Sequence, residues 1–228
     1  MSDTLKLYFA PGTCARVTLT ALEETGEPFE TSLVSFMAGD HRSPEYLALN
    51  PAGAVPTLET ADGVITQNSA ILWYLARKYP SANLLPAMTS PAAEAAMISQ
   101  LGQCASDLHP AVSRMAVPFL FAATPQAQDE LRASATERLK FLLAIREDRL
   151  GNSDWLLGAD WSVLDSYLGW AWFRITGAGF DPSPFPAIAA HYRRLHDRPA
   201  VQHALAREAA AQAELRERGL AVPGVNND

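Results

Sequence analysis

Cys14 is the residue of this 228-residue chain best placed for nucleophilic chemistry. It follows the turn-forming pair Pro11-Gly12 and stands where a helical pattern begins, so backbone N–H groups and the helix dipole favour a thiolate there. We therefore expect a lowered pKa at this thiol. A lone cysteine is also common as a small buried apolar residue, and position alone does not separate the two roles.

Two hydroxyl groups share that neighbourhood. Thr13 directly precedes the cysteine, and Tyr8 stands in a predicted strand before the turn. Either hydroxyl can donate a hydrogen bond to a bound thiolate. Thr13 can equally be a helix cap and Tyr8 an ordinary strand aromatic, so both roles stay open for each residue.

A second group of candidates surrounds Pro56, which interrupts a strand-like segment. Proline cannot donate to a sheet ladder, so Val55-Pro56 belongs to an edge strand with a trans bond or to a special turn with a cis bond. Further on, Gln67, Asn68 and Ser69 stand where another helix is predicted to begin. One polar side chain is enough to cap that helix, and three leave donors for the carboxylate of a ligand.

A histidine and two cysteines complete the reactive residues. His109 precedes Pro110 in a helical segment, where a lone histidine is often structural. Cys14 and Cys104 are the two cysteines, in no spacing typical of a disulfide framework or a zinc site. We expect free thiols and no bound metal.

Charge and hydropathy argue against several classes of protein. The formal net charge is -7, with 18 Lys+Arg against 25 Asp+Glu and no basic cluster, which argues against a nucleic-acid partner. No apolar run approaches the ~20 residues of a spanning helix, so we expect no membrane partner. The amino terminus lacks the basic flank and apolar stretch of a secretory signal, and we expect a cytoplasmic protein.

The predicted elements that position these residues divide the chain in two. Up to residue 80, an α/β pattern combines two helical segments with strand-like runs at 5–9, 29–36, 55–59 and 64–66. A proline-containing segment over 81–90 is interpreted as a linker. The remainder, 91–228, is predicted to be all-helical, with helices at 92–107, 126–149, 162–176, 187–196 and 200–218.

Several segments resemble the glutathione S-transferase superfamily, in the order that the family has them. They are residues 5–14 (LKLYFAPGTC), 50–56 (NPAGAVP), 65–76 (ITQNSAILWYLA), 156–165 (LLGADWSVLD) and 198–201 (RPAV). The first is most similar to the bacterial beta class. Together they cover most of the chain.

The resemblance implies a fold and an assembly. The fold is α/β plus all-α, with a thioredoxin-like glutathione-binding domain over 1–80, a linker over 81–90 and a helical-bundle domain over 91–228 that contributes an electrophile pocket. The assembly implied is a homodimer, and the role implied is detoxification.

The resemblance also implies a binding site for glutathione as co-substrate. Val55, before a cis Pro56, would hold the cysteinyl part of glutathione through its backbone. Gln67 and Asn68 would hold the γ-glutamyl carboxylate, and His109 would face the active site.

The implied reaction is conjugation of the glutathione thiolate to a small, largely apolar electrophile. We favour Cys14 over Thr13, and Thr13 over Tyr8, as the group that activates the thiol. One alternative is a redox enzyme of the same fold, in which Cys14 reduces disulfides or cleaves thioethers. Another is a non-catalytic carrier of hydrophobic ligands, since the first 80 residues hold five basic against nine acidic residues and offer glutathione's carboxylates few partners.

Overall fold

The computed structural model describes residues 5–221, which form two compact units. The first contains the described residues up to Leu84 together with those from Arg198 onward, and the second is Leu85–Asp197. The thioredoxin-like sheet and the helical bundle expected from the sequence are both confirmed. The observed division differs from the predicted one in the place of α9 (Pro199–Glu217), which joins the first unit because it packs along α1 (Ala15–Thr25).

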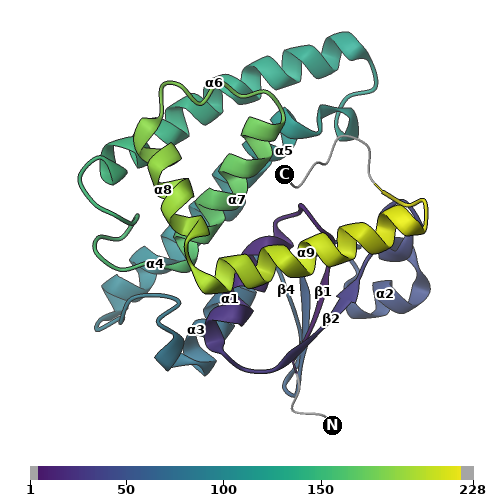
Figure 1. Cartoon of the computed structure of the whole chain (residues 1–228), viewed down its shortest axis with the longest axis horizontal. Helices are drawn as coiled ribbons and strands as arrows, with labels where there is room; N and C mark the ends of the chain where they lie inside the picture. The colour runs from purple at the N-terminus through teal and green to yellow at the C-terminus, as the bar shows by residue number, and fades with distance from the viewer. Residues whose placement is uncertain (1–4, 222–228) are drawn as a thin grey trace. The chain divides into compact units, whose positions relative to one another are not determined.

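The first unit is built on a four-stranded mixed sheet of order β2-β1-β3-β4 (Figure 1). Its central strand β1 (Leu5–Phe9) pairs in parallel with β2 (Phe29–Leu33) and antiparallel with β3 (Thr57–Thr60). The edge strand β4 (Gly63–Thr66) is antiparallel to β3. The predicted strand at 29–36 is therefore shorter than expected, and Val55 and Pro56 precede β3 instead of lying within a strand.

The side chains of β1 alternate between the two faces of this sheet. Tyr8 lies on one face, with its ring edge-on to Tyr46 of α2 (Pro44–Leu49) at 5.8 Å between centroids. The opposite face carries the fully buried apolar side chains Leu5, Leu7 and Phe9. Helices α1 and α3 (Asn68–Lys78) pack against each other within this unit. Gly26 ends α1 with φ +70, a conformation that glycine adopts without strain.

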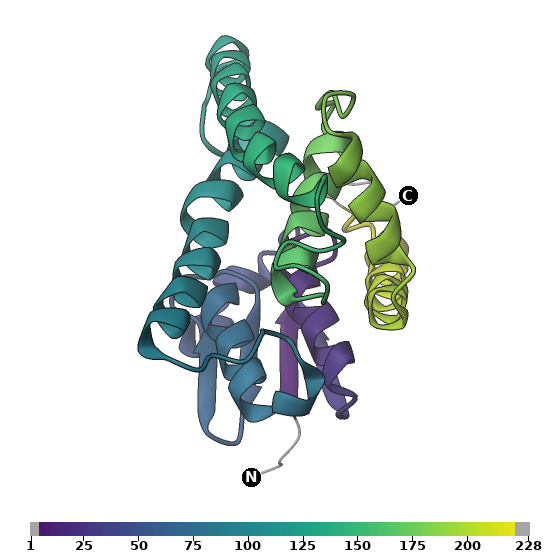
Figure 2. The same cartoon turned by 90° about the vertical axis from the view of Figure 1, so that its left-hand side faces the viewer.

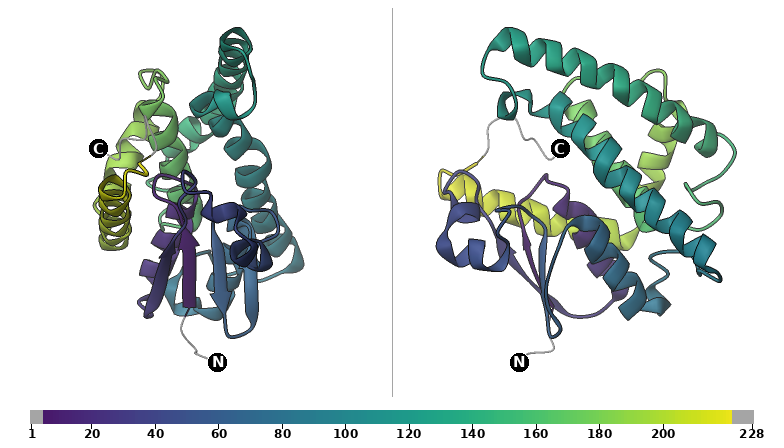
Figure 3. Two further views of the ribbon diagram at one scale, coloured as in Figure 1. Left: turned by 90° about the vertical axis from the view of Figure 1, so that its right-hand side faces the viewer. Right: turned by 180° about the vertical axis from the view of Figure 1, so that it is seen from behind.

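The second unit is a bundle of helices. α4 (Pro91–Gln103), a π-helical turn and α5 (His109–Ala116) form a nearly continuous helix that runs beside α6 (Pro125–Leu150) (Figure 3, right panel). α7 (Val163–Gly177) and α8 (Pro186–His196) pack against α5 and α6 respectively (Figure 2). Short 3-10 turns lie at Asp40–Arg42, Pro80–Ala82 and Pro118–Leu120.

Proline and small hydroxyl residues set where many of these helices begin. A proline occupies the first position of α2, α4, α6, α8 and α9, where no intrahelical N–H bond is lost. The three earliest of these helices are also capped by a hydroxyl that accepts from a first-turn N–H, supplied by Ser43, Ser90 and Thr124.

Pro110 lies inside a helical segment, at the second position of α5. Its ring crowds the carbonyl of the residue four positions earlier, and it has no N–H to donate. The helix widens into a π turn at Cys104–Leu108 and then continues as α5.

Candidate functional site

The chain enters α1 through a turn in which Gly12 has φ +73, a conformation that favours glycine. Cys14 stands at the N-cap position of the helix and is 8% exposed. Its Sγ–H donates to the carbonyl oxygen of Val55 across 3.6 Å. The turn thus places the thiol against the backbone of the loop that precedes β3.

Burial decides the protonation of this thiol. It raises the pKa of Cys14 from its ordinary 9.0 to about 12, and a backbone hydrogen bond lowers that pKa by a smaller amount. The lowered pKa expected from the sequence is therefore wrong for this structure, because desolvation of the thiolate outweighs the helix start. At neutral pH Cys14 is a neutral hydrogen-bond donor.

The Val55-Pro56 peptide bond is cis. It ends a loop in which Gly53 has φ +59, and a Cβ at Gly53 would lie 2.8 Å from the carbonyl oxygen of His41. The positive φ and the close approach at Gly53 constrain the path of the backbone in this loop.

A buried polar network holds the same loop. The carbonyl oxygen of Ala54 accepts from the Tyr46 hydroxyl at 2.7 Å and from the Asn50 amide at 2.7 Å. The Thr57 hydroxyl lies 3.0 Å from each of those two groups. Sequence reasoning missed this network, because its members carry no pattern that distinguishes them from ordinary helix and strand residues.

Both polar groups of the Asn68 side chain bind other residues of the protein. Its amide nitrogen donates to the carbonyl of Cys14 at 2.8 Å, and its oxygen accepts from Thr18 at 2.6 Å. It is 5% exposed, so it ties the start of α3 to the start of α1. Gln67 beside it is exposed and has φ +72, which is strained for a residue with a Cβ.

The two hydroxyl candidates have different partners. Thr13 donates to the carbonyl of Ala10 at 2.7 Å and accepts from the N–H of Ala15 at 3.3 Å, so it stabilises the turn. The Tyr8 hydroxyl donates to a carboxylate oxygen of Glu59 at 3.1 Å. Cys14, Val55 and Asn68 therefore form one hydrogen-bonded group, which Tyr8 does not join in this structure.

A buried ion pair supports the turn before Cys14 from α9. The Glu208 carboxylate accepts from the N–H of Gly12 at 3.1 Å and from Nε of Arg16 at 2.8 Å. The side chains of Arg16 and Glu208 are 8% and 1% exposed. Sequence reasoning missed this pair, since nothing local links residues 192 positions apart.

His109 belongs to the second unit. Its Nδ1 lies 3.1 Å from the Tyr167 hydroxyl, and its ring is edge-on to Trp170 at 4.6 Å between centroids. Burial lowers the pKa of His109 from 6.5 to about 4, so the ring is neutral at pH 7. Its expected role at the active site stays a prediction.

No group of three or more His, Cys, Asp or Glu side chains among residues 5–221 is arranged to hold a metal ion. None of the helices in that same range is both long and apolar enough to cross a membrane.

Comparison with known proteins identifies the family of the chain. Residues 12–78 match the family model described as the glutathione S-transferase N-terminal domain. Over 209 residues the chain is 32% identical to glutathione S-transferase GST-4.5 of Xanthomonas campestris pv. campestris, covering 90% of this chain and 98% of that relative. The chain belongs to the glutathione S-transferase family.

Solved structures place this glutathione S-transferase near the bacterial beta class. A sphingomonad glutathione S-transferase complexed with glutathione is 34% identical, with a TM-score of 0.78 over 90% of this chain and 98% of that one. A beta-class glutathione S-transferase of Sphingomonas chungbukensis is 30% identical, with a TM-score of 0.77 over 89% of this chain and 98% of that one. The resemblance of the sequence motifs to the glutathione S-transferase superfamily, and to its bacterial beta class, is thereby confirmed.

Proposed function

We propose that this chain is a glutathione transferase that binds glutathione along the turn before α1 and the Val55-Pro56 loop, and conjugates its thiolate to a small, largely apolar electrophile. The observation that carries the proposal is the contact between Cys14 and the carbonyl of Val55, next to a cis Pro56. In this contact a thiol donor lies beside a half-buried backbone segment.

Val55 supplies the recognition of the cysteinyl part of glutathione. Its carbonyl accepts from Cys14, and among residues 5–221 its N–H donates to no acceptor. A peptide group of glutathione pairing with this edge would satisfy that N–H, as backbone donors near a site require. Gly53, Ala54 and Pro56 carry no charge, so this part of the site recognises a peptide through the main chain.

The γ-glutamyl carboxylate of glutathione is assigned to the start of α3. Gln67 is exposed there in a strained conformation, and strain of this kind is concentrated at ligand sites. The first-turn N–H groups of α3 favour an anion. Asn68 contributes its backbone in this proposal, because its side-chain oxygen and amide already bind Thr18 and Cys14.

Cys14 acts as a hydrogen-bond donor in the proposed reaction. When glutathione binds, the Cys14 S–H turns from Val55 to the glutathione sulfur and stabilises its thiolate. The thiol proton leaves to solvent, the sulfur attacks the electrophilic carbon, and the leaving group departs with its electron pair. Disulfide exchange through Cys14 would need its own thiolate, which burial opposes, so the redox alternative ranks second.

The remaining parts of the proposal rest on the family. We infer a homodimer, a cytoplasmic location and a detoxification role from the resemblance. Sedimentation at twice the 24.7 kDa chain mass would support the dimer. Sedimentation at the chain mass alone, at micromolar protein, would contradict it.

Calorimetric titration of glutathione tests the site. We expect wild-type protein to bind with a Kd below about 1 mM. Cys14→Ala is expected to raise the pKa of the bound glutathione thiol by about 1, followed by the ultraviolet absorbance of the thiolate, because one donor to the sulfur is lost. Cys104→Ala is the matched control, since it removes a buried thiol outside the site.

Three outcomes decide between the candidate functions. Absence of glutathione binding at several millimolar would overturn the transferase proposal in favour of a hydrophobic-ligand carrier. Disulfide reduction that Cys14→Ser abolishes would favour the redox alternative. Conjugation of an activated aryl halide that Cys14→Ser retains in part would favour the transferase.

A further inference from the structure

The carboxylate of Glu208 joins helix α9 to both sides of Cys14. One oxygen, Oε1, accepts from the N–H of Gly12 at 3.1 Å, and the other, Oε2, accepts from Nε of Arg16 at 2.8 Å. Gly12 lies two residues before Cys14, and Arg16 lies two residues after it. Both oxygens of one carboxylate therefore hold the segment that carries the thiol.

Burial strengthens this double contact. The side chains of Glu208 and Arg16 are both buried, so little water competes for the carboxylate. Hydrogen bonds to an ionised acceptor are shorter and stronger than those between neutral groups. The bond to Gly12 also supports a left-handed backbone conformation, φ +73, which directs the chain into α1.

A further ion pair joins α9 to α1, and it lies at the other end of α1. Arg198 donates to both carboxylate oxygens of Glu24, at 2.8 Å and 2.9 Å. Glu24 follows Cys14 by ten residues, which is about 15 Å along an α-helix. That pair fastens α9 to α1 without touching the turn, whereas the partners of Glu208 flank the thiol.

The pair of Glu208 and Arg16 acts on Cys14 through position, because the two opposite charges compensate each other. Sγ of Cys14 lies 3.6 Å from the carbonyl oxygen of Val55, and a thiol is a weak donor. Hydrogen bonds weaken steeply as their angle closes. A small shift of the backbone on either side of Cys14 is therefore enough to turn its S–H away from an acceptor.

We propose that Glu208 is a positioning residue of the glutathione site, whose carboxylate holds Gly12 and Arg16 so that the S–H of Cys14 between them reaches the sulfur of bound glutathione. The inference rests on the proposed transferase function, in which that S–H stabilises the glutathione thiolate. Glu208 itself contacts no part of glutathione in this proposal. Helix α9 thereby takes part in setting the acidity of the glutathione thiol.

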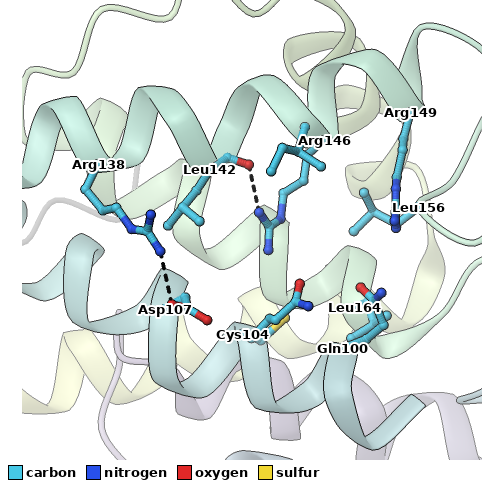
Figure 4. A pocket seen from close by; sticks show the side chains of 11 residues that line it. Gln100, Cys104, Asp107, Arg138, Leu142, Arg146, Arg149, Leu156 and Leu164 are labelled. Atoms are coloured by element: carbon cyan, nitrogen blue, oxygen red, sulfur yellow. Dashed lines mark hydrogen bonds and ion pairs between the residues drawn. The ribbon is translucent and has the colours of Figure 1, made fainter. Parts of the chain in front are cut away.

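The ultraviolet absorbance of the glutathione thiolate, followed against pH in the complex, tests this role. Neither protein thiol contributes near neutral pH, because burial raises the pKa of Cys14 to about 12 and that of Cys104 (Figure 4) to about 11. We expect Glu208→Gln to raise the pKa of the bound glutathione thiol by about 0.5 or more, since the bond from Cys14 weakens. The Kd for glutathione should change less than about threefold. Arg198→Met is the control and should leave the pKa of the bound thiol unchanged.

Two combined variants separate positioning from stability. In Cys14→Ala protein, Glu208→Gln should not raise the pKa of the bound thiol further, since the donor that it positions is absent. Arg16→Met combined with Glu208→Leu replaces the buried ion pair by apolar side chains, a change that often preserves stability. This double variant covers the case in which Glu208→Gln does not fold, and it should raise the pKa of the bound thiol as Glu208→Gln does.

Failure of this inference and failure of the transferase proposal give different results. Absence of glutathione binding to wild-type protein would overturn both. Glutathione binding with a thiol pKa that the Glu208 variants leave unchanged would overturn this inference alone. An equal rise in pKa with and without Cys14 would also overturn it, because Glu208 would then act independently of that thiol. So would an equal rise in Arg198→Met, since any loosening of α9 would then have the same effect.

Discussion

Arg16 in the first unit of this transferase and Arg146 in the second are both withdrawn from solvent, but their charges are compensated differently. In the first unit, the buried carboxylate of Glu208 is paired with Arg16 and directs the backbone of Gly12. In the second unit, Arg146 lines a cavity of about 260 Å³, with no carboxylate bound to it among the described residues (Figure 4). The compensated charge positions the main chain of another segment, whereas Arg146 donates to a neutral group, the carbonyl of Leu142.

Neutral polar groups of the first unit also position the main chain. The Tyr46 hydroxyl and the Asn50 amide donate hydrogen bonds to the carbonyl of Ala54, and the Asn68 amide donates to the carbonyl of Cys14. In the proposed site, backbone groups, the neutral Cys14 thiol and the exposed Gln67 are left for glutathione. A shortage of basic residues in the first 80 residues is therefore compatible with binding, since much of the proposed recognition does not need them.

Arg16→Met should have the largest effect of the changes considered. It leaves the carboxylate of Glu208 buried and without its ion-pair partner, so we expect the free energy of unfolding to fall by about 3–5 kcal/mol. Urea denaturation measures this fall in the free energy of unfolding. Arg198→Met removes a pair on the same α1–α9 interface, to Glu24 at 2.8 Å, but its side chain is 30% exposed and the expected loss is about 1 kcal/mol. Equal losses would contradict the distinction between the buried Arg16–Glu208 pair and the partly exposed Arg198–Glu24 pair.

The buried ring of His109 makes the free energy of unfolding of the second unit depend on pH. Its folded pKa of about 4 lies below the ordinary 6.5, so the unfolded chain binds a proton first as the pH falls. The contribution of the neutral His109 ring to the free energy of unfolding is complete above pH 6.5. It is lost progressively as the pH falls to about 4, by at most about 3 kcal/mol. His109→Phe should flatten this slope between pH 7 and pH 4.5 in urea denaturation.

The control for that experiment is His203→Gln, which changes an exposed histidine of α9. It should keep the wild-type slope. A His109→Phe protein with an unchanged slope would show that another group controls the acid transition.

Much of the fold could be predicted from local patterns. Apolar periodicity located the helices at 126–149 and 187–196 to within a residue of α6 and α8. That the segments around Cys14 and Val55-Pro56 serve one site followed from the family resemblance, and in the structure the two segments are in contact. Each of those predictions rests on residues close together in the chain.

The predictions that failed depend on tertiary surroundings. The pKa of Cys14 was expected to fall, but the packing that buries the thiol is not visible in the residues around it. The pairing of Arg16 with Glu208 and the α9–α1 contact join distant segments. The π turn at Cys104–Leu108 also has no signal in the apolar periodicity of the segment.

Tyr46→Phe tests the claim that neutral polar groups position the backbone. The change removes a hydroxyl bonded to Ala54 and near Thr57, and we expect a loss of stability of about 1–2 kcal/mol with weaker glutathione binding. Tyr74→Phe is the control, since that hydroxyl bonds to Asp62 at an exposed position. A loss of stability with unchanged glutathione affinity would limit the network to a structural role.

Arg146→Met should have the smallest effect, and it tests the comparison of the two arginines most directly. The same substitution that is costly at Arg16 leaves no carboxylate behind at Arg146, because none is bound to it among the residues described. It also removes the cost of a desolvated cation and places an apolar chain beside Leu142 and Leu164. We expect the free energy of unfolding, measured in urea, to change by less than about 1 kcal/mol. A loss as large as that of Arg16→Met would mean that Arg146 is already compensated within the protein, and that the two arginines do not differ in the way described.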